Sequence, residues 1–156
     1  YYIADLLSEI LSGGGSSRLY QALVKEKQLF SNIDCHHFGS TDAGLLAIEG
    51  KLVKGVKMEE AEKAVEAELE KMRTEKVTTT ELQKVKNKVE SLIAFEDMSL
   101  TNRANSLAFY ELLGDAGQMN HELEKYNVVT AEDILNESRI IFRPENSNTL
   151  YYYSKN

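Results

Sequence analysis

The stretch GGGSSRLYQALVKEKQLF, residues 13–30, decides the fold because it marks where one helix ends and the next begins. Apolar residues recur at helical spacing before it, at Ile3, Leu6, Leu7, Ile10 and Leu11. The glycines that follow supply the backbone freedom with which helices end. Ser16 or Ser17 can cap a second helix. The apolar residues of that helix are Leu19, Tyr20, Leu23 and Val24.

The same stretch lacks the features of a phosphate-binding loop or a nucleophile turn. A phosphate-binding P-loop has a lysine directly after its last glycine, and here Ser16 follows Gly15. A nucleophile elbow needs a glycine two residues after its serine, and Ser16 is followed there by Arg18. We therefore expect a turn between two helices.

Residues 30–53 change to the shorter period of strands. Ile33, Cys35 and His37 alternate onto one face, residues 41–44 form a turn signal, and Leu46, Ile48 and Leu52 follow. The pattern predicts a β-hairpin.

The remainder of the chain is mostly helical in pattern. A helix is expected over residues 58–72 with its glutamates on a solvated face, and Thr78 with Glu81 has the spacing of a capping box for the next helix. Further helices are expected over 102–113 and, capped at Thr130, up to Phe142, followed by a strand over 149–153. The predicted fold class is α+β, one domain over residues 1–156, with helices on one face of a mainly antiparallel sheet.

Composition restricts the function. No apolar run approaches the roughly 18 residues that span a bilayer, and the net charge of −7 without a basic cluster argues against nucleic-acid binding. One cysteine excludes an internal disulfide and leaves the compartment open. The chain does not begin with methionine, so we interpret it as a fragment of a longer protein.

The three histidines do not form a recognisable metal site. In a strand, His36 faces away from Cys35 and His37, so the three cannot converge on one ion. His121-Glu122 begins like a metalloprotease helix, but Lys125 stands where the second histidine would be. We expect no metal site in this chain.

Several ordered pieces resemble one family of zinc peptidases. The first piece is Gly15-Ser16-Ser17-Arg18-Leu19-Tyr20, followed by Gln21. The later pieces are residues 26–29, residues 42–45, residues 80–82 together with Lys86, residues 129–134 and residues 142–146. Together they are similar to the C-terminal half of the pitrilysin/insulinase (inverzincin) family, which includes the subunits of mitochondrial processing peptidase. The stretch Gly15 to Tyr20 is the family's marker loop and helix start.

The resemblance implies a two-layer half-domain that closes like a clamshell with an N-terminal half around an extended peptide. That other half carries the His-x-x-Glu-His motif and the zinc, and this chain lacks the motif. The second half often contributes an arginine and a tyrosine, and by register these positions are Val24 and Ser31 here. We therefore expect no catalytic residue in this chain.

Two functions follow from the resemblance. The first is the inactive C-terminal domain of a zinc metalloendopeptidase, which meets its zinc-bearing half or a paired subunit and a peptide substrate. The second is a purely structural subunit of a non-peptidase complex. An independent enzyme that uses Cys35 or a carboxylate site is a third alternative.

Two further expectations come from the family pattern. The family's half starts with a strand that this chain lacks, so a bared sheet edge would favour self-association. If the source is bacterial, periplasm or cell envelope is favoured.

Overall fold

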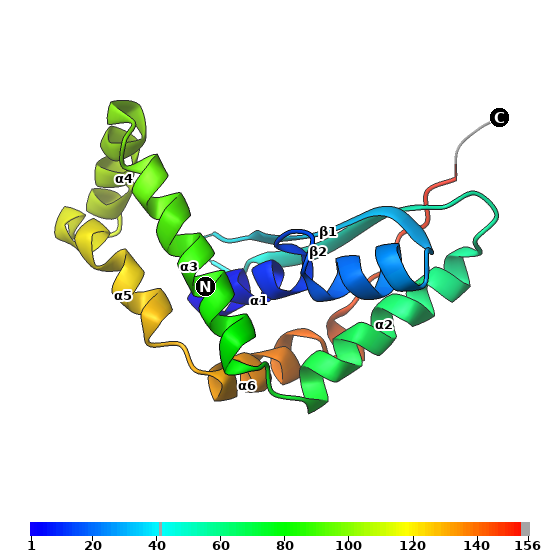
Figure 1. Ribbon diagram of the computed structural model, residues 1–156. Coiled ribbons are helices and arrows are strands. Elements are labelled where there is room, and N and C mark those ends of the chain that lie inside the picture. The colour runs from blue at the N-terminus through cyan, green and yellow to red at the C-terminus, as the bar shows by residue number, and fades with distance from the viewer. Residues whose placement is uncertain (41, 154–156) are drawn as a thin grey trace.

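A computed structural model describes residues 1–40 and 42–153 of the chain. Its elements, in order, are α1 (Tyr2–Ser12), η1 (Tyr20–Glu26), β1 (Phe30–Phe38), β2 (Leu45–Leu52), α2 (Met58–Thr74), α3 (Thr79–Glu96), α4 (Leu100–Leu112), η2 (Ala116–His121), α5 (Glu122–Asn127), α6 (Ala131–Ile141) and η3 (Pro144–Asn146). Helices α1, α2 and α6 lie on one side of the hairpin, whose other side is open (Figure 1). The expected α+β class is confirmed.

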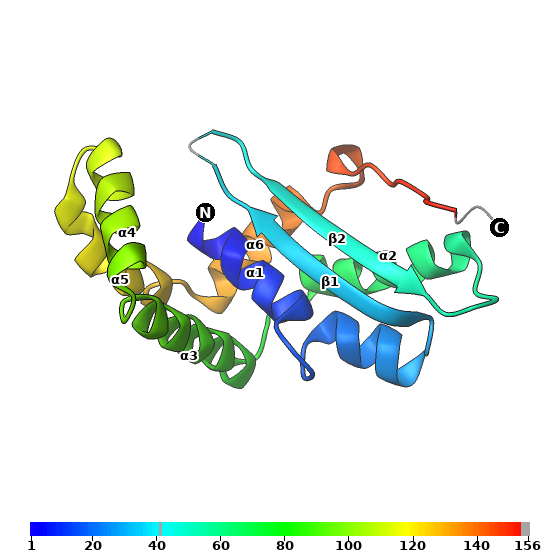
Figure 2. The same cartoon turned by 90° about the horizontal axis from the view of Figure 1, so that it is seen from above.

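The hairpin pairs β1 with β2 in antiparallel register (Figure 2). Ile33 and Cys35 are buried while His36 is exposed, which confirms the predicted alternation. Of the predicted turn, Thr41 lies outside the described residues, and the amide of Asp42 donates to Ser40 Oγ at 3.1 Å.

The core forms between α1 and the hairpin. The apolar side of α1 is fully or almost fully buried, at Leu6, Leu7, Ile10 and Leu11. Ser12 joins the helix to the strand, because its Oγ accepts from the Cys35 amide at 2.7 Å and donates to the Cys35 carbonyl at 3.0 Å. Burial raises the pKa of the Cys35 thiol to about 12, so this side chain acts as an apolar core residue at neutral pH.

Helix α2 departs from the expected solvated row of glutamates. Glu68 is 4% exposed, because it falls on the same helical face as the buried Ala64 and Met72. Its carboxylate accepts from Lys71 Nζ at 2.8 and 3.0 Å. The prediction was wrong for this one residue, since the helix period places position 68 between two core positions.

The predicted caps are present with one difference. Thr130 and Asp133 form a full capping box at the start of α6. Thr78 Oγ accepts from the Glu81 amide at 3.1 Å, but the Glu81 carboxylate bonds to Arg18 instead of returning to the cap.

The strand expected over residues 149–153 is not formed in the described structure. The segment lies along α2, where Tyr151 OH donates to Glu62 Oε2 at 2.6 Å, so no neighbouring strand offers it a ladder of backbone bonds. Helices η2 and α5 were not predicted.

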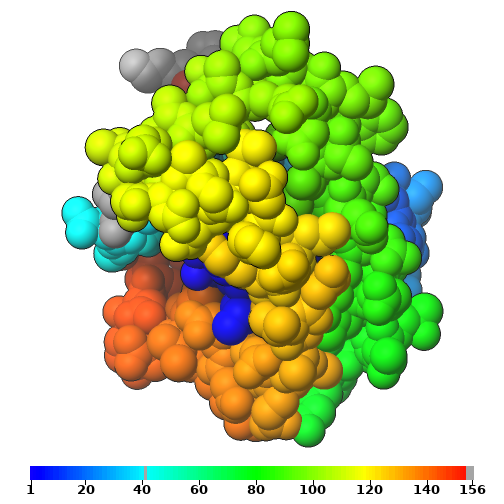
Figure 3. All heavy atoms as spheres, turned by 90° about the vertical axis from the view of Figure 1, so that its left-hand side faces the viewer, coloured from blue at the N-terminus to red at the C-terminus, as the bar shows by residue number. Residues whose placement is uncertain are grey.

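The N-terminal residues lie at the floor of a hollow between α5 and α6 (Figure 3). The residues that line it include Tyr1, Tyr2, Val128 and Val129. No helix within the described residues is long and apolar enough to cross a membrane.

Candidate functional site

The glycines of the marker stretch form the expected turn between α1 and η1. Helix α1 ends at Ser12, and the amide of Gly13 still bonds to the Glu9 carbonyl at 2.7 Å. Gly14 has a φ of +116°, a conformation that side-chain-bearing residues rarely adopt. The turn thus places this backbone conformation at the one residue type that adopts it without strain.

Three side chains of α3 hold this turn in place: Glu81, Lys84 and Lys88. Arg18 forms a two-pronged ion pair with Glu81, with Nε–Oε1 and Nη2–Oε2 distances of 2.9 Å each. Lys84 Nζ donates to Ser16 Oγ at 3.0 Å. Lys88 Nζ bonds to Glu9 Oε2 at 2.6 Å. The marker stretch therefore ties the α1–η1 connection to α3.

The Arg18–Glu81 pair is the strongest of these ties. Both side chains are largely shielded, with 18% and 19% of their surface exposed. The hydrogen bond with Arg18 lowers the pKa of Glu81, and the same bond raises the pKa of Arg18. Both groups stay charged at neutral pH, so this contact positions the turn and leaves no titrating group free for catalysis.

Neither serine caps the second helix as expected. Ser17 is 2% exposed and its Oγ has no hydrogen-bond partner within the described residues, while Ser16 Oγ bonds to Lys84. Residues 20–26 form a π-helix, and the Ser17 carbonyl bonds onward to the Gln21 amide at 3.0 Å.

Irregular backbone continues from the π-helix into β1. Gln28 has a φ of +52°, which is uncommon for a residue other than glycine, and the Leu29 amide reaches back to the Leu23 carbonyl at 2.9 Å. The pairing register then shifts between Phe30 and Asn32, which leaves Ser31 as a bulge. Such irregularities cluster at functional sites, and nothing in the sequence pattern indicated them.

The two positions taken by register for the family's arginine and tyrosine lie on this irregular segment. Val24 is in the π-helix and packs half-buried against the core. Ser31 is exposed at the bulge, where its Oγ donates to the Lys51 carbonyl at 3.0 Å. Their equivalence to the arginine and tyrosine stays a prediction.

The described residues do not fit a zinc site. No group of three or more histidine, cysteine, aspartate or glutamate side chains gathers within ranges 1–40 and 42–153. His121 is exposed and its Nδ1 lies 3.2 Å from Glu124 Oε2, the carboxylate three residues further along. We derive no step through zinc for this chain.

Comparison with known proteins places this geometry in a family. The sequence model described as the peptidase M16 inactive domain matches residues 1–89. No curated protein sequence matches the chain significantly.

Solved structures share the fold. A "putative zinc protease" from Bordetella pertussis Tohama I superposes with a TM-score of 0.86 at 21% identity, over 99% of this chain and 85% of that one. The inactive peptidase domain of a "putative zinc protease" from Bordetella parapertussis superposes with a TM-score of 0.79 at 21% identity, over 90% of this chain and 76% of that one.

A protease from Helicobacter pylori gives a TM-score of 0.79 at 26% identity over 89% of this chain. This chain spans only 34% of that protein's length. The family expected from the marker stretch is confirmed: the chain belongs to the M16 peptidases and corresponds to their inactive domain.

Proposed function

We propose that this chain is the non-catalytic C-terminal half of a two-part zinc metalloendopeptidase and forms part of the wall of its peptide chamber. The match of residues 1–89 to the inactive domain of the family carries the proposal. The zinc and the His-x-x-Glu-His motif then belong to the N-terminal half or to a paired subunit.

The open side of the hairpin supports a role as a chamber wall. Its outward side chains alternate with the core residues and include Asp34, His36 and Glu49. Strand edges of such a sheet can bind an extended peptide through backbone hydrogen bonds. The chain would shape the chamber and orient the peptide while the other half performs hydrolysis.

A reconstitution experiment tests this role. The half that precedes this chain in its parent polypeptide, or its paired subunit, is purified and mixed with this chain, and cleavage of a quenched fluorescent peptide library is measured. We expect cleavage that needs both parts and is abolished when the motif glutamate of the other half is changed to glutamine. Cleavage by the other half alone, at the same rate, would contradict the proposal.

A structural subunit is the second candidate, and Val24 and Ser31 favour it, because valine offers no donor and serine is too short to reach as tyrosine does. In that case the upstream half also lacks His-x-x-Glu-His, and no peptide is cleaved by the mixture. The sequence of the upstream half separates the two candidates.

Self-association through the hairpin edge is a further part of the proposal. Within the described residues β1 and β2 pair only with each other, so each keeps one outer edge. Sedimentation velocity at increasing concentration should show a dimer. A monomer at crystallisation-like concentrations would count against pairing of the edges.

A further inference from the structure

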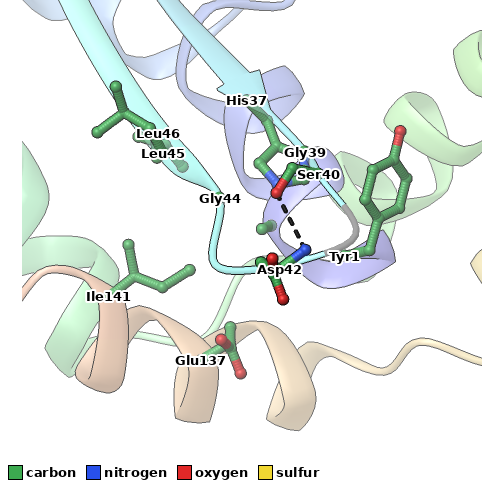
Figure 4. Close-up of a pocket in the computed structure, with 11 residues that line it drawn as sticks. Tyr1, His37, Gly39, Ser40, Asp42, Gly44, Leu45, Leu46, Glu137 and Ile141 are labelled. Atoms are coloured by element: carbon green, nitrogen blue, oxygen red, sulfur yellow. Dashed lines mark hydrogen bonds between the residues drawn. The ribbon is translucent and has the colours of Figure 1, made fainter.

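A cavity of about 260 Å³ opens at the turn end of the hairpin, between the turn, α6 and the start of α1 (Figure 4). We propose that it binds the basic side chain of a peptide, a lysine ammonium or an arginine guanidinium. The proposal rests on the proposed peptide chamber and names one class of side chain that this chain recognises. Pockets for drug-sized ligands span roughly 300–1,000 Å³, so this one suits a single side chain.

His37 is the first observation that points to a ligand. Its side chain is 7% exposed, and its Nδ1 is buried without a hydrogen-bond partner among the described residues. The nearest acceptor, Asp5 Oδ1, lies 3.8 Å away, beyond hydrogen-bond distance. The Nε2 atom of the same ring forms no hydrogen bond with the described residues either, so this buried imidazole keeps one nitrogen available to a ligand on the cavity side.

The surroundings of His37 indicate which nitrogen a ligand would meet. The Asp5 carboxylate on the Nδ1 side favours the tautomer with its proton on Nδ1. Nε2 is then an acceptor, and it lies beside the turn, 3.6 Å from where a Cβ on Gly44 would stand. Gly44 itself lines the cavity. Nε2 can therefore accept an N–H from a ligand held there.

The cavity also carries negative charge without a counterion. Asp42 in the turn and Glu137 on α6 line it, and neither carboxylate forms a hydrogen bond or ion pair with any described side chain. No lysine or arginine is among the described lining residues. Two carboxylates and an acceptor nitrogen together select a cation that donates several hydrogen bonds.

The apolar part of the wall selects an organic cation. Leu45, Leu46, Ile141 and Tyr1 are among the lining residues, and their apolar surface suits the methylene stem of a lysine or arginine. The Tyr1 ring, tilted at 59° and 5.0 Å from the His37 ring, offers an aromatic face to a cation. The cavity thus recognises both parts of a basic side chain.

Proton NMR of the histidine ring protons tests the proposal on the chain as it exists. The probes are acetyl-Gly-Gly-Arg-Gly-Gly-amide and the same peptide with neutral citrulline in place of arginine. We expect the arginine peptide to shift the His37 signals in a saturable way, with the exposed His36 and His121 signals unchanged, and the citrulline peptide to shift none. Equal shifts with both peptides, or none with arginine, would overturn the proposal.

Charge variants locate the binding. Glu137→Gln and Asp42→Asn should each lower the affinity for the arginine peptide by about two- to fivefold, as expected for partly exposed ion pairs. Glu132→Gln is the matched control on the same helix, because Glu132 pairs with Lys76 outside the cavity. An equal loss of affinity in Glu132→Gln would mean that the peptide is attracted to the acidic chain in general. That result would overturn the proposed site.

The two proposals fail separately. If His37 responds to the arginine peptide but no reconstituted mixture cleaves peptides, the chamber function fails and the cation site stands. If the mixture cleaves peptides while the His37 signals do not shift with the arginine peptide, the cation site is wrong and the chamber function stands.

Discussion

Two regions of the molecule differ in how far their large apolar side chains are buried. In residues 1–89, which we call the lobe, leucines such as Leu6, Leu7, Leu11 and Leu19 are 0% exposed. In residues 90–121, which we call the arm, Phe95, Met98, Leu100 and Leu112 are 71%, 78%, 84% and 80% exposed. Helix α4 of the arm buries only Tyr110 within the described structure.

The boundary between the regions coincides with the end of the family match. Val89 is 5% exposed, and the match to the inactive domain ends at the same residue. The fold nevertheless continues, since likeness to the Bordetella pertussis structure covers 99% of the chain. The lobe therefore supplies most of the buried apolar surface, and the arm contributes shape and an exposed surface.

The strongest way to break this comparison is a pair of leucine truncations. Leu11→Ala should lower the free energy of unfolding by about 2.7–5 kcal/mol, because it leaves a cavity at a fully buried position. Leu112→Ala on the arm should change it by no more than about 0.5 kcal/mol. Urea unfolding followed by circular dichroism measures both.

Equal losses from the two truncations would show that the arm buries Leu112 in solution. The lobe and arm would then form one core, and the contrast in exposure would not describe stability.

The next largest effect is expected at Lys86, where α3 meets the segment that leads into α6. Lys86 is 9% exposed, and its Nζ donates to the carbonyls of Asn127 and Val129 at 2.8 and 2.6 Å. Lys86→Met would leave both carbonyls without this donor. It should therefore lower the free energy of unfolding by about 1–3 kcal/mol.

Lys84→Met is the matched control for Lys86, since Lys84 is exposed and, among the residues that the structure describes, its Nζ bonds only to Ser16. It should change stability by no more than about 0.5 kcal/mol. Hydrogen exchange should show faster exchange in α5 and α6 for Lys86→Met alone. Similar losses in both variants would mean that the buried bonds contribute little.

Most of the helices and both hairpin strands could be predicted from the sequence, because each one carries its own periodic pattern. The alternation at Ile33 and Cys35 and the helix cap at Thr130 are local signals, and both were confirmed. The strand expected over 149–153 was wrong, because pairing depends on a neighbour that the local sequence does not reveal. Glu68 was misplaced because its neighbours suggested a solvated face.

The candidate sites were less predictable for a physical reason. The π-helix, the φ of Gln28 and the bulge at Ser31 depend on how η1 meets β1, which is a tertiary property. The cavity beside His37 brings together residues from four separate elements, α1, β1, β2 and α6, with Glu137 on the last of them. No spacing in the sequence indicates that Glu137 lies near His37.

A smaller effect, and one that depends on pH, is expected at Arg18 and Glu81. Glu81→Gln should lower the free energy of unfolding at pH 7 by roughly 1–2 kcal/mol, because the pair is largely shielded and two-pronged. The pKa of Glu81 is lowered in the folded chain, so its contribution is complete above the ordinary value of about 4.3. It is lost as the pH falls through the lower folded value.

The wild type and Glu81→Gln should therefore differ most near neutral pH and converge in acid. Urea unfolding at a series of pH values measures this difference. A constant difference down to pH 2 would contradict the role of the ion pair. Glu90→Gln serves as the control for removal of one charge, because Glu90 is exposed on the same helix α3 and has no side-chain bond in the described structure.

The smallest effect is expected at Gln28, with the opposite sign. A φ of +52° costs a residue with a side chain about 1–2 kcal/mol, and glycine removes that cost while it loses about 0.4–1 kcal/mol through a more flexible unfolded chain. Gln28→Gly should therefore stabilise the chain by roughly 0.5 kcal/mol. Lys27→Gly is the matched control, because Lys27 has an ordinary φ of −81° and should lose stability by roughly 0.5–1 kcal/mol. If both glycines destabilise alike, the backbone between Val24 and Ser31 relaxes in solution, and the irregular segment loses its value as a sign of a functional site.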